Sequence, residues 1–202
     1  MREIPDGVLW RRAAEGDAES FALLFERHAR RIYNYCFRRT ADWSVAEDLT
    51  SVTFLVAWQA RKRVVLEAES ALPWLYGIAT NVLRNQRRSL RRHRAALTRL
   101  PIERPYEPDF AEEAQQRLDD ERDMRALLRL VERLPRREQD AIALCDWNGA
   151  SYVDAALALG VPVGTIRSRL ARGRRRLREL AGASGHELEA HAVPLPIEVN
   201  ER

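Results

Sequence analysis

A reversal of charge near the middle of the chain, reinforced by prolines, constrains the fold of this sequence more than any other feature. Residues 84–99 contain seven arginines and no acidic residue, whereas residues 103–123 contain nine acidic residues and three arginines, a net charge of −6. Pro101, Pro105 and Pro108 lie at the reversal. They prevent a continuous helix, because proline lacks the amide donor and its ring clashes with the preceding turn. The 202 residues are therefore predicted to form two small domains joined by an acidic linker.

The spacing of apolar residues predicts helices almost throughout the chain. Near the N-terminus, apolar side chains and one histidine recur at steps of three and four residues: Phe21, Leu24, Phe25, His28 and Ile32. No segment alternates with the two-residue period of a strand. The predicted fold class is all-α. We expect an N-terminal domain at 1–98, the acidic linker at 99–122, a second domain at 123–180 and an unstructured tail at 181–202.

Two helix starts can be predicted in the first domain. Ser44 and Glu47 have the spacing of a capping box, in which the serine hydroxyl accepts a first-turn amide hydrogen bond and the glutamate reaches back. Ser70 is expected to cap the next helix, with Pro73 tolerated in its first turn.

Two short helices separated by a glycine turn are predicted in the second domain. Ser151 and Asp154 repeat the capping pattern, Gly160 ends a short helix, and Pro162 stands where the next helix begins. This arrangement is typical of a helix-turn-helix.

The second helix of this pair has a one-sided basic face. The stretch from Gly160 to Leu177 holds six arginines and no acidic residue. At 100° per residue, Leu177 joins Ile166, Leu170 and Gly173 in an apolar stripe suited to packing. A solvated helix face usually mixes both signs of charge, because like charges one turn apart repel each other. A polyanion would remove this repulsion, so we expect the helix to lie in the major groove of DNA.

The geometry of a helix-turn-helix divides the DNA contacts along this helix. Its N-terminal part reaches base edges, and later residues meet the backbone. The candidates for base readout are Arg167, Ser168, Arg169, Ala171 and Arg172. The candidates for phosphate contact are Arg174, Arg175, Arg176 and Arg178.

Composition restricts the other classes of function. Lys62 is the only lysine among 34 basic residues; arginine suits bidentate phosphate and guanine contacts, although GC-rich coding would have the same effect. Cys36 and Cys145 lie far apart and do not cluster with histidines, so we expect no metal site, disulfide framework or cofactor. No run approaches the roughly 18 apolar residues of a membrane span. We therefore expect a cytoplasmic protein.

Three segments together resemble the bacterial extracytoplasmic-function (ECF) sigma factors of the sigma-70 family. SYVDAALALGVPVGTIRSRLARGRRRL is similar to their helix-turn-helix that reads the promoter −35 element. AEDLTSVTFLVAW is similar to their polymerase-binding helix, and LPWLYGIATNVLRNQRR to their −10-reading helix. The resemblance runs from Asp17 to Leu180. It implies a subunit, not an enzyme, that binds core RNA polymerase and recognises promoters through duplex −35 and melted −10 DNA.

The resemblance also implies roles for individual residues. Asp48 and Thr50 match the polymerase-contact motif, although residues 51–53 read Ser-Val-Thr where Gln-Glu-Val is common. Arg61, Lys62 and Arg63 begin the loop in which the family holds a flipped base, and a basic track suits a captured strand.

The following helix continues the −10 contacts. Asn81 matches a position that reads the upstream edge of the −10 element. Arg84, Arg87 and Arg88 follow along the same helix and suit phosphates.

Two other functions are open on the sequence. A self-sufficient helix-turn-helix regulator would bind operator DNA as a dimer, with half-sites about one helical turn apart. An enzyme acting on nucleic acid would need a carboxylate cluster for metals or a positioned nucleophile, whereas the acidic residues are concentrated in the linker. Anti-sigma partners commonly hold ECF sigma factors inactive, and the sequence leaves open whether this chain has one.

Overall fold

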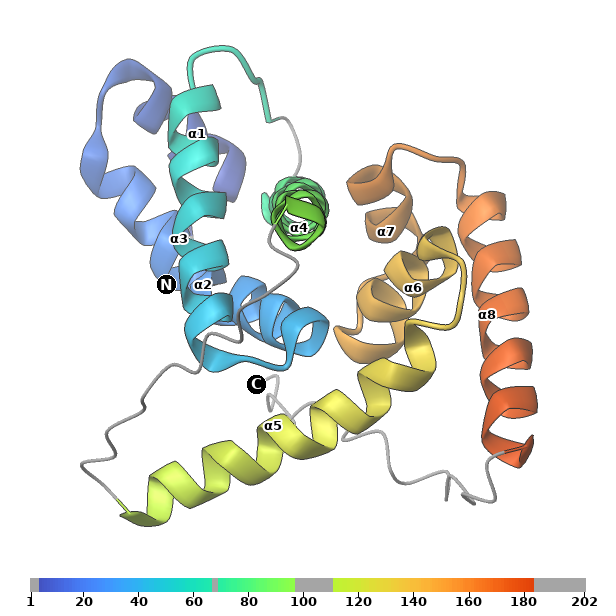
Figure 1. The fold of residues 1–202 in the computed structure, drawn as a ribbon. Coiled ribbons are helices and arrows are strands. Elements are labelled where there is room, and N and C mark those ends of the chain that lie inside the picture. The colour runs from blue at the N-terminus through green and yellow to red at the C-terminus, as the bar shows by residue number, and fades with distance from the viewer. Residues whose placement is uncertain (1–3, 67–68, 97–110, 184–202) are drawn as a thin grey trace.

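The computed structural model describes residues 4–66, 69–96 and 111–183. This part of the chain is helical apart from short connections and contains no strand, which confirms the predicted all-α class. In chain order the helices are α1 (Asp6–Glu15), α2 (Ala18–Thr40), α3 (Trp43–Ala60), α4 (Leu72–Ala96), α5 (Ala111–Val131), α6 (Arg136–Ile142), the π-helix η1 (Ala143–Trp147), α7 (Tyr152–Leu159) and α8 (Val163–Ala183). Helices α1 to α4 form one group and α6 to α8 another, with α5 passing below both (Figure 1).

The first group is built around the long pair α2 and α3, against which α1 and α4 pack. Tyr35 and Tyr76 lie in its core with their ring centroids 5.3 Å apart. The Tyr35 hydroxyl shares a hydrogen bond of 2.8 Å with Thr80 Oγ1. Burial raises the pKa of both phenols to about 12. These contacts hold the first half of α4 against α2.

The start of α3 differs from its predicted cap. The Asp42 carboxylate accepts a hydrogen bond from the Val45 amide at 2.9 Å, so the prediction that Ser44 and Glu47 form a capping box is wrong. Asp42 takes the role because it lies just outside the helix in an extended conformation, from which its carboxylate reaches a free first-turn amide. Ser70 behaves as predicted, since its hydroxyl accepts from the first amide of α4 at 3.2 Å.

The predicted helix-turn-helix is formed by α7 and α8. The Ser151 hydroxyl accepts from the Asp154 amide at 3.0 Å, which confirms Ser151 as the cap of α7, and it donates to the Asp154 carboxylate at 2.7 Å. Gly160 ends α7 with φ +62°, a left-handed conformation that costs glycine little. Helix α8 then packs on α6 and α7, and buries Ile166 and Leu170.

The acidic segment is more than a tether. Residues 111–122, which the sequence placed in the linker, form the first half of α5, while 97–110 lie outside the described residues. The Glu121 carboxylate accepts from the Trp43 amide at 3.2 Å and so supplements the cap of α3. At the other end of the chain, α8 continues to Ala183, so residues 181–183 of the predicted tail are helical; the rest of that tail lies outside the described residues.

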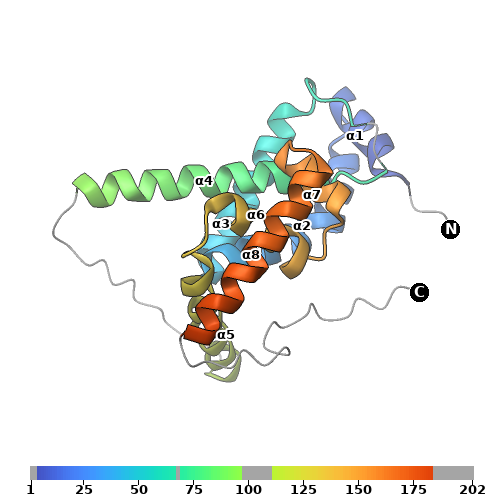
Figure 2. The ribbon, with the colours of Figure 1, turned by 90° about the vertical axis from the view of Figure 1, so that its right-hand side faces the viewer.

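Several contacts join the two groups of helices, among them two ion pairs and one close helix crossing. The Asp140 carboxylate lies 2.9 Å from Arg39 Nη2 and 2.7 Å from Arg84 Nη2. Helices α4 and α7 also cross so closely that a Cβ on Gly77 would lie 2.8 Å from the carbonyl oxygen of Ala158. The C-terminal half of α4 extends beyond this crossing, away from the other helices (Figure 2). The ion pairs and the glycine thus fix how the second group docks on α4.

We predict that Gly77→Ala weakens this docking. Alanine stabilises a helix by about 1 kcal/mol over glycine, but its Cβ would contact the Ala158 carbonyl, and backbone atoms cannot rotate away as a side chain can. Small-angle X-ray scattering should therefore give a larger radius of gyration for the variant. Gly182→Ala is the matched control, because nothing lies within 4 Å of a Cβ at that position. Equal radii for both variants and the parent chain would contradict the close crossing.

Candidate nucleic-acid interface

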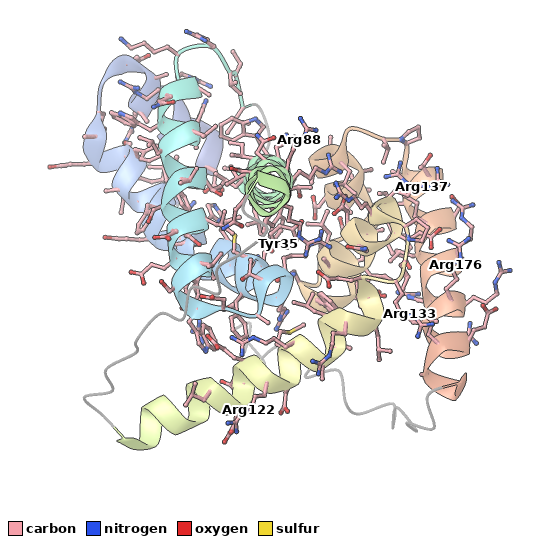
Figure 3. The ribbon with its side chains drawn as sticks, in the orientation of Figure 1. Tyr35, Arg88, Arg122, Arg133, Arg137 and Arg176 are labelled. Carbon is pink, nitrogen blue, oxygen red and sulfur yellow. The ribbon has the colours of Figure 1, made fainter. Side chains whose placement is uncertain are left out.

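The outer surface of α8 is basic. Its apolar stripe faces α6, where a Cβ on Gly173 would lie 2.8 Å from Ile142 Cδ1. Away from that stripe, the exposed candidates for DNA contact are Arg167, Ala171, Arg172, Arg174, Arg175 and Arg178, and the half-buried ones are Ser168, Arg169 and Arg176. Figure 3 shows long basic side chains projecting from this side of the molecule, with Arg176 among them. The structure therefore brings the predicted −35 residues to one surface.

The base-readout candidates at the start of α8 are little used inside the protein. Within the described part of the chain, Arg167 and Arg169 have no ion-pair partner. Arg172 Nε lies 3.7 Å from the Glu138 carboxylate, beyond hydrogen-bond distance, and 44% of its side chain is exposed. The Ser168 hydroxyl donates to the Thr165 carbonyl at 3.0 Å. Three arginines are thus available to a ligand at the end of α8 that follows the turn.

Two of the predicted phosphate contacts already hold α8 in place. Arg176 Nη1 donates to both oxygens of Glu138 at 2.5 and 2.6 Å, and the Glu138 side chain is only 1% exposed. Arg174 makes two hydrogen bonds to Asp146 of η1, and this carboxylate raises the pKa of the Arg174 guanidinium. Arg175, in contrast, has an exposed partner, Glu179, at 3.7 Å. Arg175 is therefore more readily available to a phosphate than Arg174 or Arg176.

The loop after α3 presents the first set of −10 candidates. Lys62 and Arg63 are exposed, as is Val65, with 81% of its surface accessible. Arg61 is held back against the helix, because its guanidinium carbon lies 3.5 Å from the Trp58 ring centroid and its Nη1 donates to the Trp58 carbonyl at 2.7 Å. The exposed part of the loop thus starts at Lys62.

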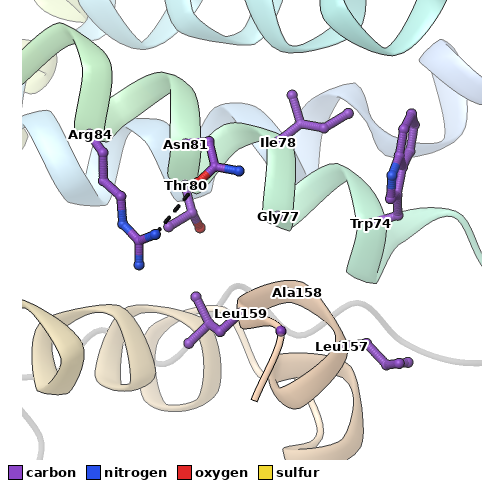
Figure 4. Close-up of a pocket in the computed structure, with 10 residues that line it drawn as sticks. Trp74, Gly77, Ile78, Thr80, Asn81, Arg84, Leu157, Ala158 and Leu159 are labelled. Carbon is purple, nitrogen blue, oxygen red and sulfur yellow. Dashed lines mark hydrogen bonds between the residues drawn. The ribbon is translucent and has the colours of Figure 1, made fainter. Parts of the chain in front are cut away.

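The second set of −10 candidates lies on α4, where it faces the other domain. Asn81 and Arg84 line a cleft of about 330 Å³ between α4 and α7, shown in Figure 4 with Arg84 pointing toward the second domain. Arg84 pairs with Asp140. Arg87 donates to the Arg39 carbonyl at 2.9 Å, and burial lowers the pKa of its guanidinium. Arg88 is exposed.

The polymerase-contact candidates on α3 divide by burial. Asp48 is exposed, but Thr50 is only 6% exposed and its hydroxyl donates to the Ala46 carbonyl at 2.7 Å. The expectation that Thr50 offers a surface contact does not agree with this placement. Thr50 lies on the buried side of α3, which packs against α2, so a role for it in polymerase binding stays a prediction.

The exposed face of α3 carries apolar side chains that the sequence reasoning missed. Val52, Leu55 and Val56 are 43%, 54% and 38% exposed. Together with Asp48 they follow helical spacing, so all four lie on one side of the helix. Their positions lie outside the stripe of α3 that packs on α2, and this spacing in the sequence could have indicated that they are exposed. We call Asp48, Val52, Leu55 and Val56 the outer face of α3.

Comparison with known proteins identifies the two groups of helices. Residues 24–93 match the family model for sigma-70 region 2, and residues 124–177 match that for sigma-70 region 4. The ECF RNA polymerase sigma factor SigE of Mycolicibacterium smegmatis is 34% identical over 161 residues, which cover 77% of this chain and 59% of SigE. The RNA polymerase sigma-H factor of Pseudomonas aeruginosa is 31% identical over 182 residues, covering 84% of this chain and 90% of that factor. This chain is an ECF sigma factor of the sigma-70 family.

A solved structure shares the arrangement of this sigma factor. RpoE from Bartonella quintana, in complex with the anti-sigma factor NepR, matches with a TM-score of 0.60 and 25% identity over 81% of this chain and 98% of RpoE. The chain spans 59% of the length of SigE, so SigE contains further sequence that this sigma factor does not match.

Two negative findings concern other kinds of site in the sigma factor. Within residues 4–66, 69–96 and 111–183, no three His, Cys, Asp or Glu side chains are grouped so as to hold a metal ion. None of the helices in these ranges combines the length and the apolar character of a membrane span.

Glu138 and Asp140 are the residues of this surface that sequence reasoning did not find. Both are buried, and both pair with arginines that the sequence assigned to DNA. No sequence pattern marks them, because their partners lie 38 to 101 positions away and meet them only in the folded chain.

We predict that Arg176 stabilises the second domain. Arg176→Ala leaves the buried Glu138 carboxylate without two hydrogen bonds, which should lower the free energy of unfolding by about 1–3 kcal/mol. Chemical denaturation of the variant measures this loss. Arg175→Ala is the control, and because its ion pair is exposed, its effect should stay within about 0.5 kcal/mol. A loss for Arg176→Ala no larger than that of the control would make Arg176 a surface residue without a structural role.

Proposed function

We propose that this sigma factor binds core RNA polymerase and directs it to promoters, with α8 on the duplex −35 element and the first domain on the melted −10 element. The observation that carries the proposal is the exposed basic face of α8, which follows the Gly160 turn and lies opposite the stripe that packs on α6. An anti-sigma partner is supported by the likeness to RpoE, which was solved with NepR. The proposed activity takes place in the cytoplasm, where core polymerase works.

At the −35 element, α8 enters the major groove with its N-terminal end. Arg167, Ser168, Arg169, Ala171 and Arg172 then face base edges, as the geometry of a helix-turn-helix requires. Arg175 meets the backbone most readily, since its exposed pair with Glu179 contributes little. Arg174 and Arg176 reach phosphates only as far as their pairs with Asp146 and Glu138 allow, so their first role is to hold α8.

At the −10 element, a separated strand passes the exposed loop residues Lys62 and Arg63 and continues along α4. Arg61 borders this path, and Arg88 extends it with an exposed charge. Asn81 and Arg84 lie at the edge of the second domain but are exposed, whereas Arg87 is half-buried. DNA reaches Asn81 directly, and its phosphates compete with Asp140 for Arg84. Arg87 becomes accessible when α6 moves away from α4.

Polymerase docks on the outer face of α3. Its three exposed apolar side chains suit a helical partner, because burying each removes apolar area from water. Asp48 supplies a charge at the edge of this surface. Thr50 contributes to this docking indirectly, because it is buried beneath the surface and helps to hold α3 against α2.

Run-off transcription with core polymerase tests this function. On a genomic fragment library, the parent sigma factor should yield discrete transcripts that core polymerase alone does not produce. Leu55→Asp should abolish them while the variant stays folded, because Leu55 is already 54% exposed and its charge would be buried only in the complex. Tight binding of duplex DNA by the chain without polymerase, and transcripts unaffected by Leu55→Asp, would instead indicate a self-sufficient DNA-binding regulator.

We also predict that Arg172 reads sequence whereas Arg175 does not. For the holoenzyme, Arg172→Ala should reduce the preference for the native −35 element over a mutated one by about 1–3 kcal/mol. Arg175→Ala should weaken binding to both DNAs equally and make the slope of log affinity against log salt about 0.9 shallower. Filter binding at several salt concentrations measures both quantities. Equal losses on both DNAs for Arg172→Ala would place it on the backbone.

A further inference from the structure

Helix α1 holds the beginning of the loop that connects α3 to α4. The indole Nε1 of Trp10 donates to the carbonyl oxygen of Val64 at 2.7 Å. Trp10 is 3% exposed, and its ring meets that of Trp74 in the first turn of α4 with centroids 4.8 Å apart. One side chain of α1 therefore contacts both the loop and the helix that follows it.

The end of the same loop is held by Asp6, one helical turn before Trp10. Its Oδ2 accepts from the Ala71 amide at 2.7 Å and lies 2.6 Å from His28 Nε2, while Arg27 pairs with Oδ1. The Asp6 amide donates to the Glu69 carbonyl at 3.2 Å. Asp6 thus accepts one hydrogen bond from Ala71 and donates one to Glu69, and both of these residues lead into α4.

The charge of Asp6 is maintained in this buried position. Burial alone would raise the pKa of Asp6, which is 1% exposed. The hydrogen bonds from His28 and from the Ala71 amide outweigh burial and lower this pKa to about 2. The carboxylate is therefore ionised at neutral pH and accepts these hydrogen bonds at full strength.

Exposed side chains of the loop flank the first of these two attachments. Lys62, Arg63 and Val65 face solvent, while Val64 and Ala71 are bonded to α1. Asp6 and Trp10 are four residues apart and so lie on one face of α1. A rigid helix thereby fixes the distance between the two ends of the loop. Helix α1 also precedes residues 24–93, the part of the chain that matches sigma-70 region 2.

We propose that Trp10 and Asp6 are positioning residues for the capture of an unstacked −10 base, because they hold residues 62–66 and the start of α4 in the arrangement that receives it. This inference rests on the proposed function of that loop. A base that leaves the stack costs free energy to unpair. Residues 62–66, already held at Val64, add little further ordering entropy to this cost.

The test compares Trp10→Phe with the parent sigma factor, each assembled with core polymerase. Phenylalanine keeps an aromatic ring against Trp74 but removes the donor to Val64. The probe is a promoter duplex with 2-aminopurine in the nontemplate −10 element, whose fluorescence rises when the base leaves the stack. We expect the equilibrium for base opening to fall about three- to tenfold, the effect of one hydrogen bond. Polymerase affinity and −35 preference should remain unchanged.

The control is Trp43→Phe, which also removes an indole N–H from this domain. Trp43 begins α3 and stacks on Phe37 with centroids 3.6 Å apart, whereas the loop follows the last residue of α3. Trp43 therefore lies about 27 Å from the loop at 1.5 Å per residue. An equal loss of base opening in both variants would reduce the role of Trp10 to general stability, and no loss in Trp10→Phe would overturn the inference.

Two further readouts separate the possible failures. Absence of a fluorescence change with the parent holoenzyme would refute the proposed −10 function itself, independently of Trp10. Hydrogen exchange of the free proteins measures the loop without DNA: Trp10→Phe should accelerate exchange at the Ala71 amide and in 61–66, whereas Trp43→Phe should not. If Trp10→Phe fails to fold, Asp6→Asn replaces it, since the asparagine oxygen still accepts from Ala71 but carries no charge. Parent-like base opening in a folded Asp6→Asn would overturn the inference for Asp6.

Discussion

The carboxylate of Asp140 is the point on which the arrangement of the two domains depends. It binds Arg39 in the interior and Arg84 at the edge of α4, so one acidic residue of the second domain neutralises two basic residues of the first. A buried ion pair adds little net stability, because both charges lose their hydration. It does select one way of docking, since any other would leave Arg39 or Asp140 without its partner. Arg39 Nε and Nη1 lack a hydrogen-bond partner among the described residues, so the contact is not fully satisfied.

The arginines of α8 are likewise of two kinds, those paired with a carboxylate of another helix and those on the outer surface. Arg174 and Arg176 point toward carboxylates that are buried or half-buried, and they fix the orientation of α8. Arg167, Arg172 and Arg175 remain on the outer surface. This division follows from the helix itself. Arg174 and Arg176 lie on the flanks of the packing stripe and form hydrogen bonds with η1 and α6, whereas Arg172 stays 3.7 Å from Glu138. A single basic sequence therefore supplies both the side chains that orient α8 and the exposed charges that we propose contact DNA.

At the other end of the molecule, the loop before α4 is likewise held in place by a neighbouring helix, α1. In the loop that precedes α4, Val64 and Leu66 pack against the core, whereas Val65 is 81% exposed. The two ends of the loop are bonded to α1 through Trp10 and Asp6. Neither α8 nor this loop is thus ordered by its own residues alone. Each is held in part by polar contacts to elements distant in the sequence.

The sequence alone determined the helical class, the helix-turn-helix with its glycine turn, and the apolar stripe of α8, because each depends on residues within a few positions of one another. The match of three motifs to ECF sigma factors was readable for the same reason. Only the tertiary structure decided that Asp42 caps α3, that residues 111–122 belong to α5, and that Thr50 is buried against α2. It also decided which arginines are paired, since Glu138 and Asp140 meet theirs across long stretches of chain. Local patterns predict on which side of its helix a residue lies. Which residue it then pairs with depends on how the helices pack.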